Sequence, residues 1–267
     1  MVKRRVPIAI GMVALTLLCC LWGPVPRLIF LLLCGLAATW ETWRILSKDG
    51  HWSYMLILLA FVLCCGLLSL LHVPWFWCVV AFFAAAQFVL ATAALIYREG
   101  GGKDALMALM ALVYPGSLFG LLLYISQLSD WIWPFAVGQL TAWICDSAAL
   151  IVGKKWGKRH LSTPVSPHKT VEGCVAGAVA ALPTGLLCWA LFRGTCPLSL
   201  WVWMLICLIS SSWGQIGDLA ASLVKRFAGA KDFSNLLGPH GGVMDKFDSM
   251  VFSIPLAYLC LRIAGVM

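Results

Sequence analysis

Four aspartates and four basic residues lie within residues 218–248, in a chain in which only 11% of the residues are charged. Asp218, Asp245 and Asp248 lie at the ends of apolar runs, where a charge is costly if the runs lie in a membrane. Asp245 and Asp248 are three residues apart, so on a helix they share a face and repel each other unless a cation joins them. Because hard oxygen ligands select Mg²⁺ or a similar ion, the spacing predicts a metal site held by these three aspartates.

Basic and small residues near these aspartates suit the phosphates of a nucleotide. Lys225, Arg226 and Lys231 supply positive charge for a triphosphate. The tripeptide His240-Gly241-Gly242 gives a flexible backbone that can approach phosphate oxygens closely. The segment Ser166-Pro-His-Lys-Thr170 places donors just before an expected helix N-terminus, which is a natural position for an anion.

The elements that must position these residues are membrane helices. The mean hydropathy is +0.93 and 62% of the residues are hydrophobic, more than a soluble domain of this length needs. The apolar runs are continuous and do not alternate as the strands of a membrane barrel would. We therefore predict an all-α, polytopic transmembrane bundle with about nine spans. The runs cover residues 6–22, 27–45, 53–72, 74–97, 105–128, 131–152, 171–193, 198–221 and 247–266.

The charges of the loops predict the topology. If the N-terminus is cytoplasmic, sixteen of the 19 lysines and arginines fall on the cytoplasmic side. We expect the first run to be a retained helix, since no small-residue cleavage site follows it. The net charge of +8 then lies on the cytoplasmic face, where it suits anionic lipids and nucleotide phosphates. We expect a multi-pass protein of the inner membrane whose active site faces the cytoplasm, with no nucleic-acid partner.

This topology gathers the acids of the C-terminal half near one leaflet boundary. Asp146 and Asp218 fall in the cytoplasmic thirds of the sixth and eighth runs, and Lys169 and Glu172 open the seventh. The spacing therefore predicts a site for a metal and phosphate at a membrane surface.

Two parts of the chain differ in their chemistry. We predict N-terminal transmembrane helices over residues 1–130. Catalytic helices are predicted over residues 131–267, with cytoplasmic loops at 153–170 and 222–246. The sequence shows no internal repeat, and its polar loops are too short for an independent soluble core. The twelve cysteines lie almost entirely in apolar runs and read as small hydrophobic residues.

Taken together, the motifs resemble the signature of the phosphatidate cytidylyltransferases, also called CDP-diacylglycerol synthases. The resemblance covers about residues 146–248 and departs from the family pattern at three places. Gly238-Pro239 reverses the usual Pro-Gly, Lys246 replaces an arginine, and Ala221 stands where some members have an acid. The matching residues are Asp146, Ser166-Pro-x-Lys169-Thr170-x-Glu172-Gly173, Ser222-x-x-Lys225-Arg226, Lys231-Asp232, His240-Gly241-Gly242 and Asp245-x-x-Asp248.

The resemblance implies that the protein transfers CMP from CTP to phosphatidic acid, giving CDP-diacylglycerol and pyrophosphate for phospholipid synthesis. It implies a Mg²⁺-dependent nucleotidyltransferase that works in the lipid bilayer; the number of metal ions and a homodimeric state stay open. The implied catalytic residues are Asp218, Asp245, Asp248, Lys225 and Lys169, of which the aspartates hold the metal. The implied substrate-binding residues are Asp146, Ser166, Lys169, Thr170, Glu172, Ser222, Lys225, Arg226, Lys231, Asp232, His240, Gly241 and Gly242.

Two other functions stay open at this point. Intramembrane acids and many helices would also suit an ion-coupled transporter, although the acids cluster at one depth and no repeat is present. Another CTP-using lipid enzyme, such as a polyprenol kinase, would share the nucleotide. CTP labelled at the α-phosphate distinguishes a cytidylyltransferase from such a kinase, because only the cytidylyltransferase leaves this label on the lipid.

Several of the polar residues also have a structural interpretation. In that interpretation, Asp146 is a buried acid that forms hydrogen bonds between helices. Lys231 and Asp232 are then a pair of charged residues in a solvated loop. Glu41, which lies between two tryptophans, reads as an anchor at the membrane interface or a partner of Arg44. Alternatively, Glu41 lines a path by which lipid enters the site.

Overall fold

The structure, a computed structural model, describes residues 14, 16, 18, 19, 21–47, 50–95, 101–161, 165–167 and 169–267. Across these residues the named elements are all helical, and an isolated bridge pairs His160 with Thr170. The all-α prediction is therefore confirmed. The predicted first span, 6–22, lies mostly outside the described residues.

Within the described ranges, seven helices are long and apolar enough to cross a membrane. They coincide with the second to the eighth predicted runs. The ninth run is divided between α10 (Met244–Phe247) and α11 (Met250–Ile263), and α11 has only 14 residues. The total of nine spans thus stays a prediction. The seven candidates are Pro24–Leu46, Trp52–Leu70, Phe76–Leu95, Gly102–Ser126, Ile132–Trp156, Val171–Phe192 and Leu200–Phe227.

The chain packs as two compact units. One unit comprises Met1–Leu128 together with Ala230–Asp245, and the other comprises Ser129–Gly229 together with Lys246–Met267. A segment late in the sequence therefore packs with the N-terminal helices. The predicted division at residue 130 follows the chemistry of the chain and stays a prediction.

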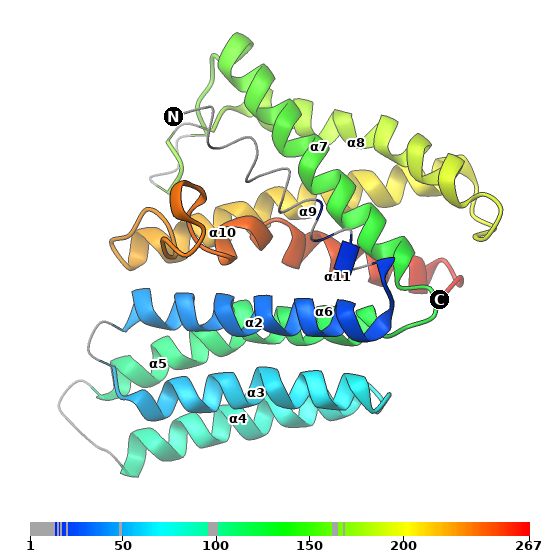
Figure 1. Ribbon diagram of the computed structural model, residues 1–267. Coiled ribbons are helices and arrows are strands. Elements are labelled where there is room, and N and C mark those ends of the chain that lie inside the picture. Colours follow the sequence, from blue (N-terminus) through cyan, green and yellow to red (C-terminus); the bar gives the residue numbers. More distant parts are fainter. Residues whose placement is uncertain are drawn as a thin grey trace. The chain divides into compact units, whose positions relative to one another are not determined.

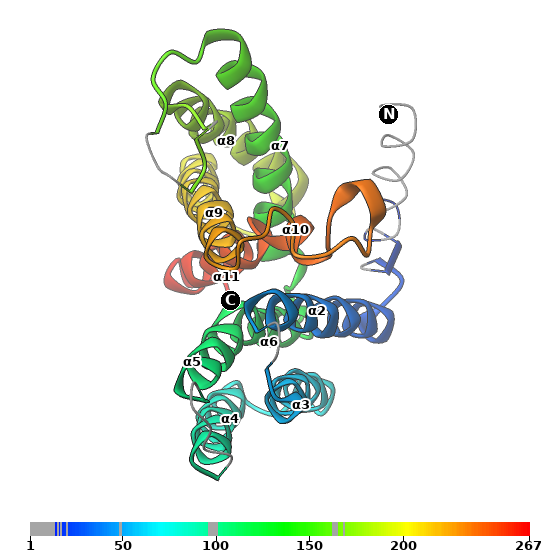
Figure 2. The ribbon, with the colours of Figure 1, turned by 90° about the vertical axis from the view of Figure 1, so that its left-hand side faces the viewer.

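The first unit is a group of helices in which α2 packs against α3 and α6, and α3 packs against α4 (Figure 1). Figure 2 shows α3 nearly end-on. Pro24 opens α2, where its missing N–H costs no hydrogen bond. Pro115 lies in the distorted turn that joins α5 to α6. The elements are α2 (Pro24–Leu46), α3 (Trp52–Leu70), α4 (Phe76–Leu95), α5 (Gly101–Ala111), η1 (Leu112–Ser117) and α6 (Leu118–Ser126).

The second unit contains α7 (Ile132–Trp156), α8 (Val171–Phe192), α9 (Leu200–Phe227) and α11. Helix α8 packs against α7 and α9, and α11 packs against the same two helices (Figure 1). A buried core around Trp203 joins them. Helices α7 and α9 extend by a few residues into the predicted loops. This unit places Asp146 on α7, Lys169 before α8, Asp218 on α9 and Asp248 before α11.

Candidate active site

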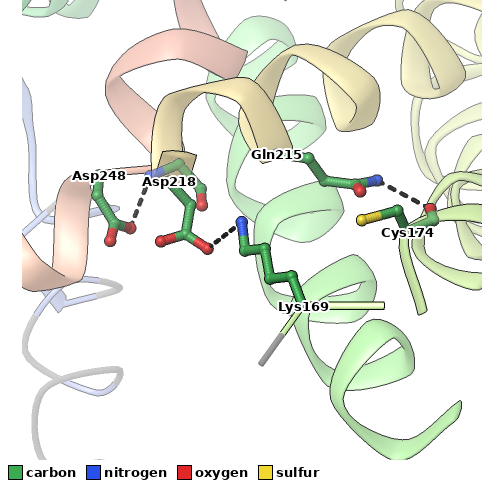
Figure 3. A network of polar contacts seen from close by, with 6 residues as sticks. Lys169, Cys174, Gln215, Asp218 and Asp248 are labelled. Atoms are coloured by element: carbon green, nitrogen blue, oxygen red, sulfur yellow. Dashed lines mark hydrogen bonds and ion pairs between the residues drawn. The ribbon is translucent and has the colours of Figure 1, made fainter. Parts of the chain in front are cut away.

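An ion pair between α9 and the residue before the N-cap of α8 lies at the centre of the candidate site. Lys169 Nζ lies 2.6 Å from Asp218 Oδ2, and the two side chains are 23% and 30% exposed (Figure 3). Partial burial strengthens such a pair relative to the same pair in bulk water. The pair therefore holds a lysine ammonium and a carboxylate together where water and a ligand can still reach them.

A second carboxylate lies beside this pair. Asp248 comes just before α11, outside the seven candidate spans, and its Oδ1 accepts a hydrogen bond from the Ser249 N–H at 2.7 Å (Figure 3). Burial, together with the nearby Asp218 and Asp146 carboxylates, raises the pKa of the Asp248 carboxyl to about 8, although Lys225 acts in the opposite direction. Three acids thus interact with one another in a partly dehydrated place.

Such a set of oxygen donors fits a hard divalent cation. Mg²⁺ is usually held by one or two carboxylates together with water and substrate phosphates, and Asp218 with Asp248 provide two carboxylates of this kind. Among the residues that the structure describes, no group of three or more His, Cys, Asp or Glu side chains has an arrangement that could hold a metal ion.

The face of α9 that carries Asp218 also carries polar side chains that hydrogen-bond to α7 and α8. Ser211 Oγ donates to Cys145 Sγ of α7 at 2.8 Å. Gln215 Nε2 donates to the Cys174 carbonyl of α8 at 3.2 Å (Figure 3). Ser211, Gln215 and Asp218 are spaced by four and three residues, so they lie on one helix face. Sequence reasoning missed Ser211 and Gln215, although this spacing was visible.

Gly217 allows the chain around Asp248 to approach α9. A Cβ atom at Gly217 would lie 2.6 Å from the Asp248 carbonyl oxygen and 2.8 Å from Phe252 Cδ2. A carbonyl oxygen cannot move without moving the backbone, so only glycine fits here. The residue that precedes Asp218 therefore brings the two aspartates together.

Replacing Gly217 with alanine should push α9 and the Asp248 segment apart. We expect about 1–3 kcal/mol of lost stability, as for other overpacked cores. A shift of this kind should also lower activity by about 100-fold. Gly194→Ala is the matched control, because a Cβ there meets nothing within 4 Å. Thermal unfolding and turnover of both variants measure the effect, and an unchanged Gly217→Ala protein would contradict it.

The predicted residues between α7 and α8 organise the connector that carries Lys169. Thr170 is buried and caps α8, its Oγ1 accepting from the Gly173 N–H at 3.2 Å. Both carboxylate oxygens of Glu172 lie 3.2 Å from the Arg159 N–H, which donates to them. The Ser166 carbonyl accepts from the Lys169 N–H at 3.2 Å. In the structure, these residues hold Lys169 in place.

The predicted residues at the end of α9 belong to the same unit. Arg226 Nε donates to the Val165 carbonyl at 3.4 Å, which ties the helix end to the connector. Lys225 lies one residue earlier, close enough to Asp248 to lower the pKa of that carboxyl. Ser222 is half-buried on the same helix. Asp146, Lys169, Asp218, Lys225 and Asp248 are thus brought together within one unit.

The remaining predicted residues lie in the segment Ala230–Asp245 of the other unit. Lys231 and Asp232 are exposed, and His240 ends the short helix η2 (Gly238–His240). Asp245 Oδ2 accepts hydrogen bonds from the Phe233 N–H at 2.8 Å and the Gly242 N–H at 2.9 Å. The predicted role of Asp245 as a third metal ligand stays a prediction.

Glu41 takes a place that the sequence did not indicate. Its side chain on α2 is 0% exposed and accepts hydrogen bonds from the Ser234 hydroxyl, the Val243 N–H and the Met244 N–H. Arg44 instead lies over the Trp40 ring, 5.1 Å from its centre. The hydrogen bonds of Glu41 thus run to residues 234–244 and not to Arg44, and its position at a membrane interface stays a prediction. The available signal was the cost of a carboxylate inside an apolar run.

Comparison with known proteins gives the family. A model of the Cytidylyltransferase family matches residues 3–264. Similar proteins named phosphatidate cytidylyltransferase occur in Staphylococcus haemolyticus (strain JCSC1435), with 35% identity over 158 residues, and in Staphylococcus saprophyticus, with 36% identity over 160 residues. The one from Staphylococcus aureus (strain COL) is 34% identical over 160 residues. Each similarity covers 59% of this chain and 59% of the relative. Because the family model covers nearly the whole length, the chain belongs to the cytidylyltransferase family.

Proposed function

We propose that this protein transfers CMP from CTP to phosphatidic acid, giving CDP-diacylglycerol and pyrophosphate. The observation that carries the proposal is the cluster in which Lys169 pairs with Asp218 beside Asp248, at the polar ends of apolar helices. Membership of the cytidylyltransferase family supports CTP as the nucleotide, and the similarity to proteins named phosphatidate cytidylyltransferase supports phosphatidic acid as the lipid.

In this reaction a phosphate oxygen of phosphatidic acid attacks the α-phosphorus of CTP. The new P–O bond forms while the bond between the α-phosphorus and the bridging oxygen breaks, and that oxygen leaves with pyrophosphate. No strong general base is required, because the lipid phosphate is already an anion at neutral pH. The work of the protein is therefore to orient two anions and to balance their charge.

The residues of the cluster suit that work. Lys169 presents an ammonium, held by Asp218, that would orient the lipid phosphate or the nucleotide. Lys225 would offset charge on the leaving pyrophosphate. Asp218 and Asp248 would hold Mg²⁺, with Asp245 the third ligand expected from the sequence. When bound, the metal would neutralise phosphate charge.

We further propose the topology that the charge distribution predicts. The protein would have nine spans, its N-terminus in the cytoplasm and its site at the cytoplasmic face of the inner membrane. CTP then reaches the site from the cytosol, and the lipid reaches it within the leaflet. A cysteine placed at Lys158 should react with an impermeant maleimide only from the cytoplasmic side; labelling from outside would contradict this topology.

The proposed reaction is tested by incubating purified protein with CTP labelled at the α-phosphate, phosphatidic acid and Mg²⁺. We expect label on the lipid and release of pyrophosphate. Labelled lipid should be absent when phosphatidic acid or the metal is omitted. If label from the γ-phosphate reaches the lipid instead, the protein is a kinase; if neither label reaches it, the proposal is wrong.

A further inference from the structure

We propose that Glu41 of α2 is a positioning residue that holds the segment 233–244 in its folded form and thereby orients Asp245. The proposal rests on the proposed function, because Asp245 is assigned there to the transfer of CMP.

Two carboxylates hold the two ends of this segment. Glu41 Oε1 accepts from the Ser234 hydroxyl at 2.6 Å and from the Val243 N–H at 2.9 Å, and Oε2 accepts from the Met244 N–H at 2.9 Å. Asp245 Oδ2 accepts from residues next to these, at Phe233 and Gly242. Each carboxylate thus bridges the start and the end of one loop.

The glycines of His240-Gly241-Gly242 fit these carboxylates. A Cβ at Gly242 would lie 2.6 Å from Glu41 Oε2, and a Cβ at Gly241 would lie 2.7 Å from Asp245 Oδ2. Gly241 also has φ of +81°, which disfavours other residues. The close packing of the backbone around the chain's own acids therefore accounts for both glycines.

Burial gives these hydrogen bonds their importance. The Glu41 side chain is 0% exposed, so hydrogen bonds from Ser234, Val243 and Met244 take the place of water around its carboxylate. Hydrogen bonds to a charged group are stronger than those between neutral groups. Met244 directly precedes Asp245, so a shift of its N–H away from Glu41 moves the backbone of Asp245 as well.

Glu41→Gln provides the main test. Both oxygens of Glu41 are acceptors, and a glutamine offers only one, so its NH₂ group must face a donor. We expect kcat to fall by about 10–100-fold, as for other residues that orient a ligand. More Mg²⁺ should be needed for half of the maximal rate, and excess Mg²⁺ should restore part of it. Glu41→Asp, which keeps the charge, should retain more activity than Glu41→Gln.

Two further variants separate positioning from general stability. Ser234→Ala removes one of the three donors and should give a smaller loss of kcat than Glu41→Gln. Asp104→Asn alters a half-buried carboxylate of the same unit, which accepts from Ser47 Oγ at 3.3 Å, and should leave kcat and the Mg²⁺ requirement unchanged. If Glu41→Gln keeps normal kcat, or if Asp104→Asn loses as much, the proposal is wrong.

Hydrogen exchange tests the same idea without activity. In nanodiscs, amides of residues 233–245 should exchange faster in Glu41→Gln than in the unaltered protein, while peptides of α8 and α9 should not change. This result would support Glu41 even if no CMP transfer were found, so failure of the proposed function can be told apart. If Glu41→Gln does not fold, Ser234→Ala must show the faster exchange at 243–244, and its absence would overturn the proposal.

Discussion

Replacing Asp218 with asparagine should lower the rate of CMP transfer by about 10²–10³-fold, the loss typical when one preorganised charged or polar group is removed. The variant keeps the size of the side chain but removes the charge that pairs with Lys169. It also removes one of the two carboxylates that are proposed to hold the cation. Initial rates with labelled CTP at saturating substrates measure the effect.

Asp130→Asn is the matched control for this prediction. Asp130 is a partly buried carboxylate of the same unit that accepts from Ser129 Oγ at 2.9 Å, far from the cluster in sequence. We expect its activity to match that of the unaltered protein. The double variant Lys169→Met/Asp218→Asn removes both charges, so it should regain stability lost by Asp218→Asn alone but remain inactive. Recovery of activity in the double variant would show that the ion pair is only structural.

Replacing Asp245 with asparagine should strongly lower turnover that depends on CTP and Mg²⁺. Asparagine can turn its amide oxygen toward the Phe233 and Gly242 N–H groups and keep both hydrogen bonds that Asp245 accepts. The fold of the loop should therefore survive while the negative charge is lost. We expect a fall of about 10²–10³-fold in kcat with little change in thermal stability.

Asp245→Ala completes the comparison, because it removes both the charge and the acceptor. Each buried N–H left without a partner costs about 1–3 kcal/mol, so this variant should be less stable as well as inactive. Thermal unfolding in detergent separates the two variants. Full activity in Asp245→Asn would rule out the proposed role for this carboxylate in holding the metal.

The apolar pattern was enough to predict most of the helices. The predicted run 27–45 became α2, and the run 171–193 became α8, each within a few residues of its predicted ends. Apolar runs predict helices because every backbone N–H and C=O group in a lipid environment must find its hydrogen-bond partner within the segment, as it does in a helix. The pattern did not show that the last run divides at Asp248, nor that α5 and α6 are joined by a distorted turn at Pro115.

The local sequence also indicated which residues could bind phosphate and a metal, but contacts between segments far apart in the sequence decided the partners of these residues. The partner of Asp218 is Lys169, 49 residues earlier, and Glu41 accepts hydrogen bonds from a segment that begins 193 residues later. Periodicity and propensity describe neighbours within a few turns of one helix, so neither contact follows from them. The local sequence did not indicate that Gly217 must be a glycine, because the requirement comes from the Asp248 carbonyl oxygen on another segment.

The sequence by itself determined that this protein is built from long apolar helices typical of a membrane protein, and it predicted acids and lysines suited to a nucleotide and a metal. Those features depend on composition and on short-range spacing, which a single chain displays directly. Only the tertiary structure decided that Lys169 faces Asp218, that Ser211 and Gln215 orient α9, and that Glu41 is buried against the loop before Asp245. These contacts arise when helices pack, because helix rotation and crossing depend on the whole interface between them.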